Sequence, residues 1–207
     1  FDMTVAGIYA RSYNTGTVQI AEKITDEQRY EYMRSFGVGQ PIDLGLPQQA
    51  GSVLVPPEQW DGRQRLTTAF GQGYTQTTLH TAQMYQALAN GGVQPVTGEQ
   101  VFTGAQVRHV MSVMLTCGMY DSAGDWVSSV GIPAKSGVGG GIIGALPGQV
   151  GIGTYSPRLD PFGNSVRGVE MCRIMSEDLD LHIVDRDKEV IVYDCTAISP
   201  RELEFYL

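Results

Sequence analysis

GIPAKSGVGGGIIG, at residues 131–144, carries the clearest structural pattern of the chain. In this stretch Lys135 and Ser136 are followed by small residues, so a cation and a hydroxyl lie where backbone N–H groups are accessible to a ligand. That combination suits a carboxylate and a tetrahedral oxyanion. The stretch therefore predicts a strand edge that belongs to an active site, with Lys135, Ser136 and Gly137 as candidate residues.

The residues after this motif predict a hairpin. Apolar and β-branched residues continue to Leu146, and a second run extends from Val150 to Ser156. Between them, Pro147-Gly148-Gln149 has the composition of a tight turn. We therefore expect two strands, 134–146 and 150–156, paired antiparallel.

Helical patterns surround the predicted hairpin. Thr25-Asp26-Glu27-Gln28 has the form of a capping box, and Asn90-Gly91-Gly92 supplies a left-handed stop. Residues 39–73 are rich in Pro, Gly and Gln and predict little regular structure. Apolar periodicity and capping residues together predict helices over 4–22, 25–36, 77–89, 104–116 and 164–180. The fold class is α+β, with helices on both faces of an antiparallel sheet.

Bulk composition excludes several classes of partner. The 207 residues suffice for one main core, and their formal net charge is −8. An acidic chain lacks the clustered basic face that nucleic-acid binding requires. No stretch has the length of a membrane helix, and the N-terminus does not resemble a signal peptide. We expect a soluble protein that binds a small molecule rather than nucleic acid or membrane.

The sequence predicts neither a metal nor a cofactor. Three cysteines, Cys117, Cys172 and Cys195, are widely spaced and favour free thiols in a reducing compartment. The histidines stand alone on expected helix faces or ends, and the aspartates have no spacing typical of acid/base pairs; these residues are His80, His109, His182, Asp121, Asp125, Asp178 and Asp180.

Residues 1–93 resemble the transpeptidase domain of class B penicillin-binding proteins from high-GC Gram-positive bacteria. The resemblance rests on Ser12-Tyr13-Asn14-Thr15-Gly16-Thr17, Phe36-Gly37-Val38-Gly39, Asp43-Leu44-Gly45-Leu46-Pro47, Phe70-Gly71-Gln72-Gly73-Tyr74 and Ala87-Leu88-Ala89-Asn90-Gly91-Gly92. It implies that the Ser12 hydroxyl relays a proton and that the Asn14 amide binds the substrate. A helix cap or polar helix surface is the alternative reading of these two residues.

From about 89 to 184 the chain resembles bacterial glutaminases of the serine β-lactamase-like superfamily. The matching motifs are Asn90-Gly91-Gly92-Val93, Pro95-Val96-Thr97-Gly98-Glu99, Met114-Leu115-Thr116-Cys117-Gly118-Met119-Tyr120-Asp121, Pro133-Ala134-Lys135-Ser136-Gly137-Val138-Gly139-Gly140-Gly141, Ser156-Pro157 and Gly163-Asn164-Ser165. Both families share one fold. The resemblance therefore implies a chimera of two relatives, with segments 1–93, 94–184 and a tail, 185–207, that weakly resembles a truncated STAS-type module.

The two resemblances assign further roles. Lys135 draws the substrate carboxylate, Ser136 hydrogen-bonds it, and Gly137 lets the ligand approach the backbone. The N–H of Val138 supplies half of an oxyanion hole. The Tyr120 phenol relays a proton or orients the substrate amide, although a core tyrosine is the alternative.

No Ser-x-x-Lys nucleophile pair occurs in the sequence, because only Lys23, Lys135 and Lys188 exist and none has Ser three places earlier. We therefore expect the nucleophile-bearing front of the fold to be absent and catalysis to be impaired. Three hypotheses stay open: a glutaminase-class amidohydrolase, a penicillin-binding transpeptidase fragment, and a non-catalytic remnant or binding module. Exposed apolar surface favours a homo-oligomer, and the glutaminase resemblance implies a cytoplasmic location, against an extracytoplasmic one for the other family.

Overall fold

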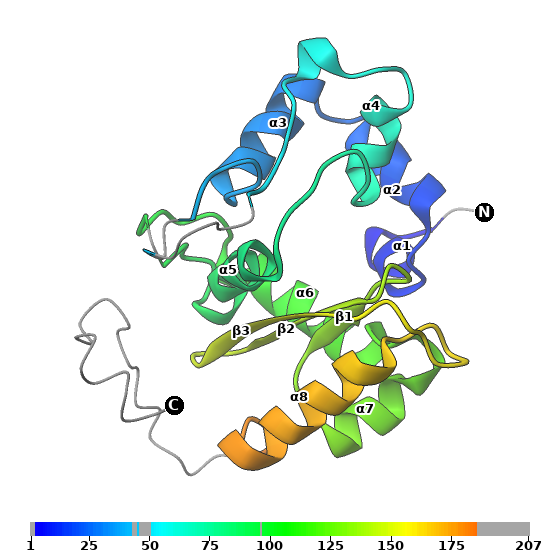
Figure 1. Cartoon of the computed structure of the whole chain (residues 1–207), viewed down its shortest axis with the longest axis vertical. Helices are drawn as coiled ribbons and strands as arrows, with labels where there is room; N and C mark the ends of the chain where they lie inside the picture. Colours follow the sequence, from blue (N-terminus) through cyan, green and yellow to red (C-terminus); the bar gives the residue numbers. More distant parts are fainter. Residues whose placement is uncertain (1–2, 43–44, 46–50, 96, 186–207) are drawn as a thin grey trace.

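In the described part of the chain the sheet has three antiparallel strands, β1 (Ala134–Ser136), β2 (Gly141–Leu146) and β3 (Val150–Tyr155), in the order β1-β2-β3. The computed structural model describes residues 3–42, 45, 51–95 and 97–185 (Figure 1). The β2–β3 hairpin forms as the sequence predicts, with Leu146 opposite Val150. The predicted tail, including Cys195, lies outside the described residues apart from Asp185.

The prediction of one long strand over 134–146 is wrong. The chain reverses at 137–140, where the Gly137 N–H donates to the Gly141 carbonyl at 2.9 Å. Gly140 has φ +96°, and a Cβ there would lie 2.4 Å from the Ser156 carbonyl oxygen. This turn needs a conformation and a close approach that only glycine allows, so the glycine run produces two strands, β1 and β2.

Helices cover both faces of the sheet, as the sequence predicts (Figure 1). On one face lie α5 (Thr78–Ala89) and α6 (Gly104–Cys117), and on the other lie α7 (Ala123–Ser129) and α8 (Val166–Leu179). The sequence pattern did not predict a helix over 123–129. A short 3₁₀ turn, η3 (Tyr120–Ser122), connects α6 to α7.

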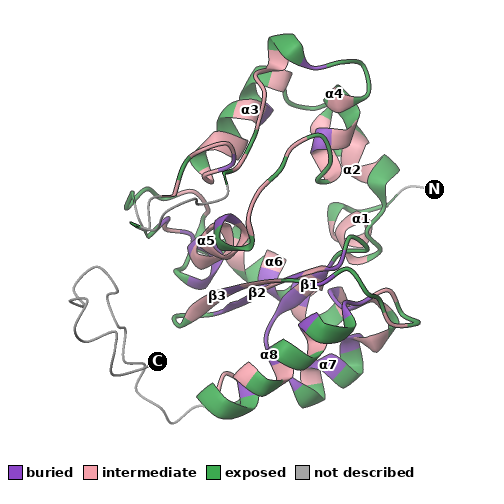
Figure 2. Cartoon of the chain, viewed as in Figure 1, coloured by how far each residue is buried: buried purple, intermediate pink, exposed green. Residues whose placement is uncertain are grey.

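Two apolar clusters form the core, one on each face of the sheet. The first lies between the sheet and α7 and α8 and includes Trp126, Ile142 and Cys172. The second lies between the sheet and α5 and α6 and includes Leu88, Met114 and Ala145. Figure 2 shows the buried residues concentrated along the strands and on the helix sides that face them. The α+β architecture is therefore confirmed.

The prediction of a single helix over 4–22 is wrong. The structure has α1 (Val5–Ala10) and α2 (Asn14–Ala21), and Ser12 between them has φ +53°. The N–H of Tyr13 donates to the Ile8 carbonyl at 3.1 Å, which is the pattern of a left-handed helix stop. The reversal packs α2 on α1, and at Gly16 a Cβ would lie 2.8 Å from the Ile8 side chain.

The remaining segments form an upper layer in Figure 1. It holds α3 (Asp26–Ser35), which begins with the predicted capping box, and the short elements η1 (Pro57–Gln59), α4 (Gln64–Thr67) and η2 (Thr68–Phe70). The capping box is confirmed by bonds from the Gln28 N–H to Thr25 and from the Thr25 N–H to Gln28.

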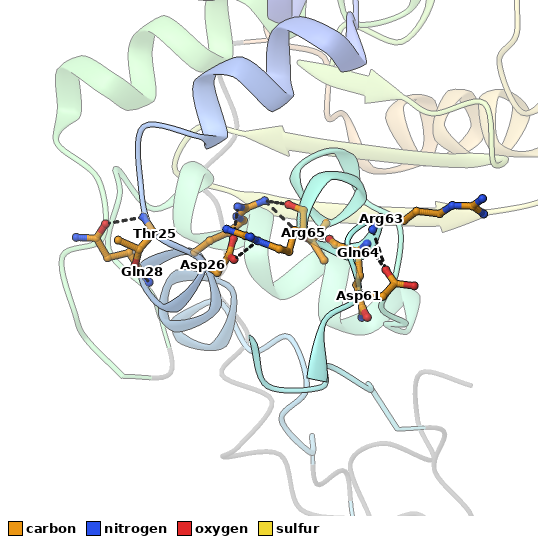
Figure 3. Close-up of polar contacts among 9 residues, drawn as sticks. Thr25, Asp26, Gln28, Asp61, Arg63, Gln64 and Arg65 are labelled. Carbon is orange, nitrogen blue, oxygen red and sulfur yellow. Dashed lines mark hydrogen bonds and ion pairs between the residues drawn. The ribbon is translucent and has the colours of Figure 1, made fainter. Parts of the chain in front are cut away.

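One ion-pair network holds α3 against α4 (Figure 3). The buried Arg29 pairs with Asp26 at 2.9 Å, and the other Asp26 oxygen accepts from Arg65 Nε at 2.6 Å. Arg29 also donates to the Arg65 carbonyl at 2.6 Å and to the Thr68 hydroxyl at 3.3 Å. A buried guanidinium needs such partners, so this network fixes α4 and the start of η2 against α3.

Candidate functional site

The candidate site is a cavity with two adjoining parts between the sheet, the α1–α2 turn and the start of α5. The outer lobe has a volume of 730 Å³ and is lined by residues that include Arg11, Ser12, Asn14, Tyr120 and Val138. The lysine lobe has a volume of 560 Å³, and its lining includes Lys135 and Ser136. Residues common to both lobes are Ser12, Gly71, Gln76, Thr81, Gly137, Gly141 and Ile143. The structure therefore brings together segments that the sequence analysis singled out separately.

Strand β1 places Lys135 on the cavity side of the sheet. Lys135 is directly opposite Ile143, which lines both lobes, and opposite residues of an antiparallel pair share a face. Its Nζ donates to the Ser136 carbonyl and lies 4.4 Å from the centroid of the Tyr120 ring. Burial lowers the pKa of Lys135 to about 8, because desolvation disfavours the charged amine. A carboxylate entering the lysine lobe would favour the protonated form again.

Tyr120 begins η3 and closes the cavity near the turn of the sheet. Its hydroxyl donates to the Ser136 carbonyl at 3.1 Å, and its φ is +53°. Burial raises the pKa of its phenol above the usual value. Gly163 lies beside the ring, and a Cβ there would be in ordinary van der Waals contact with it at 3.6 Å. The phenol is thus held neutral and oriented toward β1.

Ser136 lies on the opposite face of β1 from Lys135. It is directly opposite Ile142, a member of the cluster under α8, and its residue is 2% exposed. Within the described part of the chain its Oγ has no hydrogen-bond partner. What Ser136 contributes toward Lys135 and Tyr120 is its backbone carbonyl, which accepts from both. The predicted bond from its hydroxyl to a substrate carboxylate stays a prediction.

The turn after β1 offers backbone donors. Gly137 and Val138 are exposed, and the Val138 side chain is 74% exposed. Among the described residues, the N–H groups of Val138 and Gly139 donate to no protein acceptor. Free, adjacent N–H groups beside a cation are the arrangement expected for an anion or oxyanion site.

Ser12 and Asn14 reach the outer lobe from the α1–α2 turn. Both residues are exposed, and Ser12 lines both lobes. Asn14 is the first residue of α2, and Tyr13 precedes it without a side-chain cap. The left-handed conformation of Ser12 turns this segment toward the sheet. Ser12 therefore lines the same lobe as Lys135, although the two residues are far apart in the sequence.

Sequence reasoning missed Gln76 and Thr81 as lining residues. Gln76 Nε2 donates to the Thr81 hydroxyl at 2.8 Å, and that hydroxyl donates in turn to the Thr77 carbonyl at 3.2 Å. This chain leaves the buried Gln76 Oε1 without a partner among the described residues. No motif marks these residues, because polar residues at the start of a helix are common.

The other sequence-selected side chains lie apart from the cavity. His80 is buried and bonded to Thr77 and to the Gln40 carbonyl, His182 bonds the Val127 carbonyl, and His109 is exposed on α6. Cys117 and Cys172 are free thiols, and burial raises the pKa of Cys172 to about 12. Across the described ranges no group of three or more His, Cys, Asp or Glu could hold a metal ion.

Comparison with known proteins identifies the relatives of this chain. The model of the family described as Glutaminase matches residues 68–184. A glutaminase from Microcystis aeruginosa is 58% identical over 102 residues, which are 49% of this chain and 30% of that protein. Glutaminase 1 from Bradyrhizobium diazoefficiens is 51% identical over 113 residues, which are 55% of this chain and 18% of that protein.

Solved structures agree with the sequence matches. Mglu in its native form has 49% identity and a TM-score of 0.56, and the match covers 62% of this chain and 32% of that one. Mglu in its L-glutamate binding form gives 49% identity, a TM-score of 0.55, and coverage of 62% and 29%. The chain therefore spans about a third or less of the length of these relatives. None of these matches supports a transpeptidase segment or a chimera.

Proposed function

Because the chain belongs to the glutaminase family, we propose that its cavity binds the amino-acid substrate of a glutaminase-class amidohydrolase. In that reaction L-glutamine and water give L-glutamate and ammonia. The observation that carries the proposal is the family match over residues 68–184, which includes Tyr120 and 135–138. The cavity geometry supports it, since Lys135 lines the lysine lobe and the free N–H groups of the turn border the adjoining outer lobe.

Each site residue has a proposed task. Lys135 attracts the substrate carboxylate, and the Ser136 carbonyl orients the Lys135 amine and the Tyr120 phenol. Gly137 leaves room for the ligand, and the Val138 N–H binds the developing oxyanion. The Ser136 hydroxyl faces the opposite side of β1 and could hydrogen-bond the substrate carboxylate only after this strand rearranges. The neutral phenol of Tyr120 orients the substrate amide or relays its proton. Asn14 and Ser12 contact the substrate from the opposite side of the outer lobe, with the Ser12 hydroxyl relaying a proton.

The sequence supports hydrolysis of the bound amide less than it supports binding of the substrate. The printed sequence contains no Ser-x-x-Lys pair, so the Ser nucleophile and Lys base that the superfamily resemblance implies have no counterpart in it. We therefore propose that this chain binds glutamine and glutamate and hydrolyses the amide poorly. If the rate of hydrolysis is zero, the same proposal describes a module that only binds glutamine and glutamate.

Calorimetric titration with L-glutamate, together with an ammonia-release assay on L-glutamine, tests this function. Lys135→Met should abolish glutamate binding, and Lys23→Met, which changes an exposed lysine outside the cavity, should leave it unchanged. Absence of heat at millimolar glutamate would refute the binding site. Rapid ammonia release that survives Ser12→Ala and Lys135→Met would refute the assigned roles.

A transpeptidase-like origin of residues 1–93 is a separate proposal. It is supported only by the sequence motifs between Ser12 and Gly92 that carry the resemblance, and the comparisons do not favour it. Covalent labelling by a fluorescent penicillin that is lost in Ser12→Ala would support this origin. Absence of labelling would refute it. The division at 93 and 185 can be tested by limited proteolysis.

The state of the protein in solution is also a proposal. Across the residues that the structure describes, no helix has both the length and the apolar character needed to cross a membrane. We propose a cytoplasmic homo-oligomer without a cofactor, on the basis of the family and of exposed apolar side chains such as Phe162 and Val184. Light scattering during size-exclusion chromatography measures the oligomeric state, and a monomeric mass would contradict it.

A further inference from the structure

We propose that Lys135 is a nucleophilic amine that forms a Schiff base with small aldehydes carrying a carboxylate. Lys135 is the lysine that lines the lysine lobe, and the chain has only two others, Lys23 and Lys188. The proposal concerns a covalent modification of the site. It does not require that the chain hydrolyse glutamine.

The Lys135 amine forms no ion pair with a carboxylate of the described residues. Its Nζ donates to the Ser136 carbonyl and lies over the Tyr120 ring, and the structure records no ion pair for it within the described part of the chain. A carbonyl oxygen and a phenol ring face hold the amine in place while leaving its lone pair available once a proton is lost.

Among the described residues that line the two lobes, none has a negatively charged side chain. The charged and titratable side chains that line the two lobes with Lys135 are Arg11, Tyr74, Tyr120 and Tyr155. Burial raises the pKa values of Tyr74 and Tyr120 above the usual phenol value, so both stay neutral near pH 8. No carboxylate of the described lining therefore stabilises the ammonium form, and burial lowers the pKa of Lys135 to about 8. At that pH about half of the Lys135 amine is neutral, against less than about 1% of an ordinary lysine.

The same cavity favours a carbonyl compound that carries an anion. The Arg11 side chain lines the outer lobe, and the N–H groups of Val138 and Gly139 are free at its rim. The outer lobe shares Gly137, Gly141 and Ile143 with the lysine lobe, so a carboxylate attracted by these groups enters the space that adjoins Nζ. Glyoxylate, the smallest aldehyde with a carboxylate, is the appropriate probe.

The chemistry balances without another reactant. The Nζ lone pair forms a bond to the aldehyde carbon, and the C=O π electrons move to oxygen. A proton passes from nitrogen to that oxygen to give a carbinolamine, and loss of water leaves the C=N bond. In the test, cyanoborohydride is the reductant that converts this imine to a stable secondary amine.

The test is labelling of the whole chain with glyoxylate and cyanoborohydride at pH 8, followed by peptide mass spectrometry. Lys23 follows α2 and is exposed, so it serves as the control within each sample. We expect Lys135 to carry the carboxymethyl group at least about tenfold more than Lys23, given the difference in neutral fraction. Propionaldehyde should give a smaller Lys135-to-Lys23 ratio, because it carries no carboxylate.

Two results would overturn the proposal. One is equal or weaker labelling of Lys135 than of Lys23 in protein whose circular dichroism shows a folded chain. The other is an equal ratio for glyoxylate and propionaldehyde, which would remove the carboxylate preference. The glutamate titration is run separately on unlabelled protein, so failure of glutamate binding with selective Lys135 labelling would refute the proposed function alone.

Discussion

Lys135 and Tyr120 meet at one backbone atom: the amine and the phenol both donate to the carbonyl oxygen of Ser136, and the amine lies 4.4 Å from the phenol ring centroid. The two residues are 15 positions apart and come from β1 and η3. Their contact connects the sheet edge to the start of α7. It also removes solvent from the amine, which is the cause of its lowered pKa.

The burial of Lys135 predicts a specific pH dependence of stability. Its pKa falls from 10.5 to about 8 on folding, so between these values the unfolded chain binds more protons at this residue than the folded chain. The contribution of Lys135 to the free energy of unfolding therefore increases as pH rises through this window, and it is constant below about pH 8.

Urea denaturation of wild type and Lys135→Met at several pH values measures this contribution. The wild type should gain stability relative to the variant between pH 8 and 10.5. Lys23→Met is the control and should change in parallel with the wild type. Parallel curves for Lys135→Met as well would show that Lys135 is solvated in the folded protein.

Removal of the Tyr120 hydroxyl should lower stability modestly. Tyr120→Phe loses the bond to the Ser136 carbonyl and keeps the ring over Lys135, so we expect a loss of about 1 kcal/mol in unfolding free energy. Tyr120→Leu also loses the cation–π contact and should lose about 0.5–1 kcal/mol more. Tyr155→Phe, at an exposed phenol, is the control. Equal stability of Tyr120→Phe and wild type would mean that water replaces the bond.

Two glycine substitutions should have opposite effects on stability, because Gly153 packs tightly against α5 and Gly124 of α7 has open space around it. At Gly153 a Cβ would lie 2.6 Å from the Thr78 carbonyl oxygen, so Gly153→Ala must push the helix from the strand, with a loss of about 1–3 kcal/mol. At Gly124 in α7 a Cβ meets nothing within 4 Å, and Gly124→Ala should stabilise by about 0.5–1 kcal/mol. Thermal unfolding of both variants compares them, and a neutral Gly153→Ala would indicate looser packing.

The ion-pair network of α3 should depend strongly on Asp26. Asp26→Asn leaves the buried Arg29 guanidinium without its charged partner, so we expect a loss of about 3 kcal/mol. Glu170→Gln removes an exposed partner of Arg173 on α8 and should produce no measurable change. Denaturation of both variants at two salt concentrations provides the comparison. Similar small effects for the two would mean that Arg29 remains hydrated in solution.

Local patterns in the sequence were sufficient for several elements. The capping box at Thr25 and Gln28 forms, and the helices expected at 77–89 and 104–116 appear as α5 and α6. The hairpin whose turn contains Pro147 also forms in the expected place. These features depend on neighbours within a few residues, so the sequence contains nearly all of the information that they need.

Tertiary structure decided the features that depend on distant contacts. The break at Ser12 exists because α2 packs back on α1, and the Ser136 hydroxyl faces α8 because β1 pairs with Ile142 on that side. The lowered pKa of Lys135 requires Tyr120 and the cavity walls, which come from segments far apart in the chain. The sequence alone determined which chemical groups are present, and packing determined which of them share one space, because burial and strand pairing join residues that have no local pattern in common.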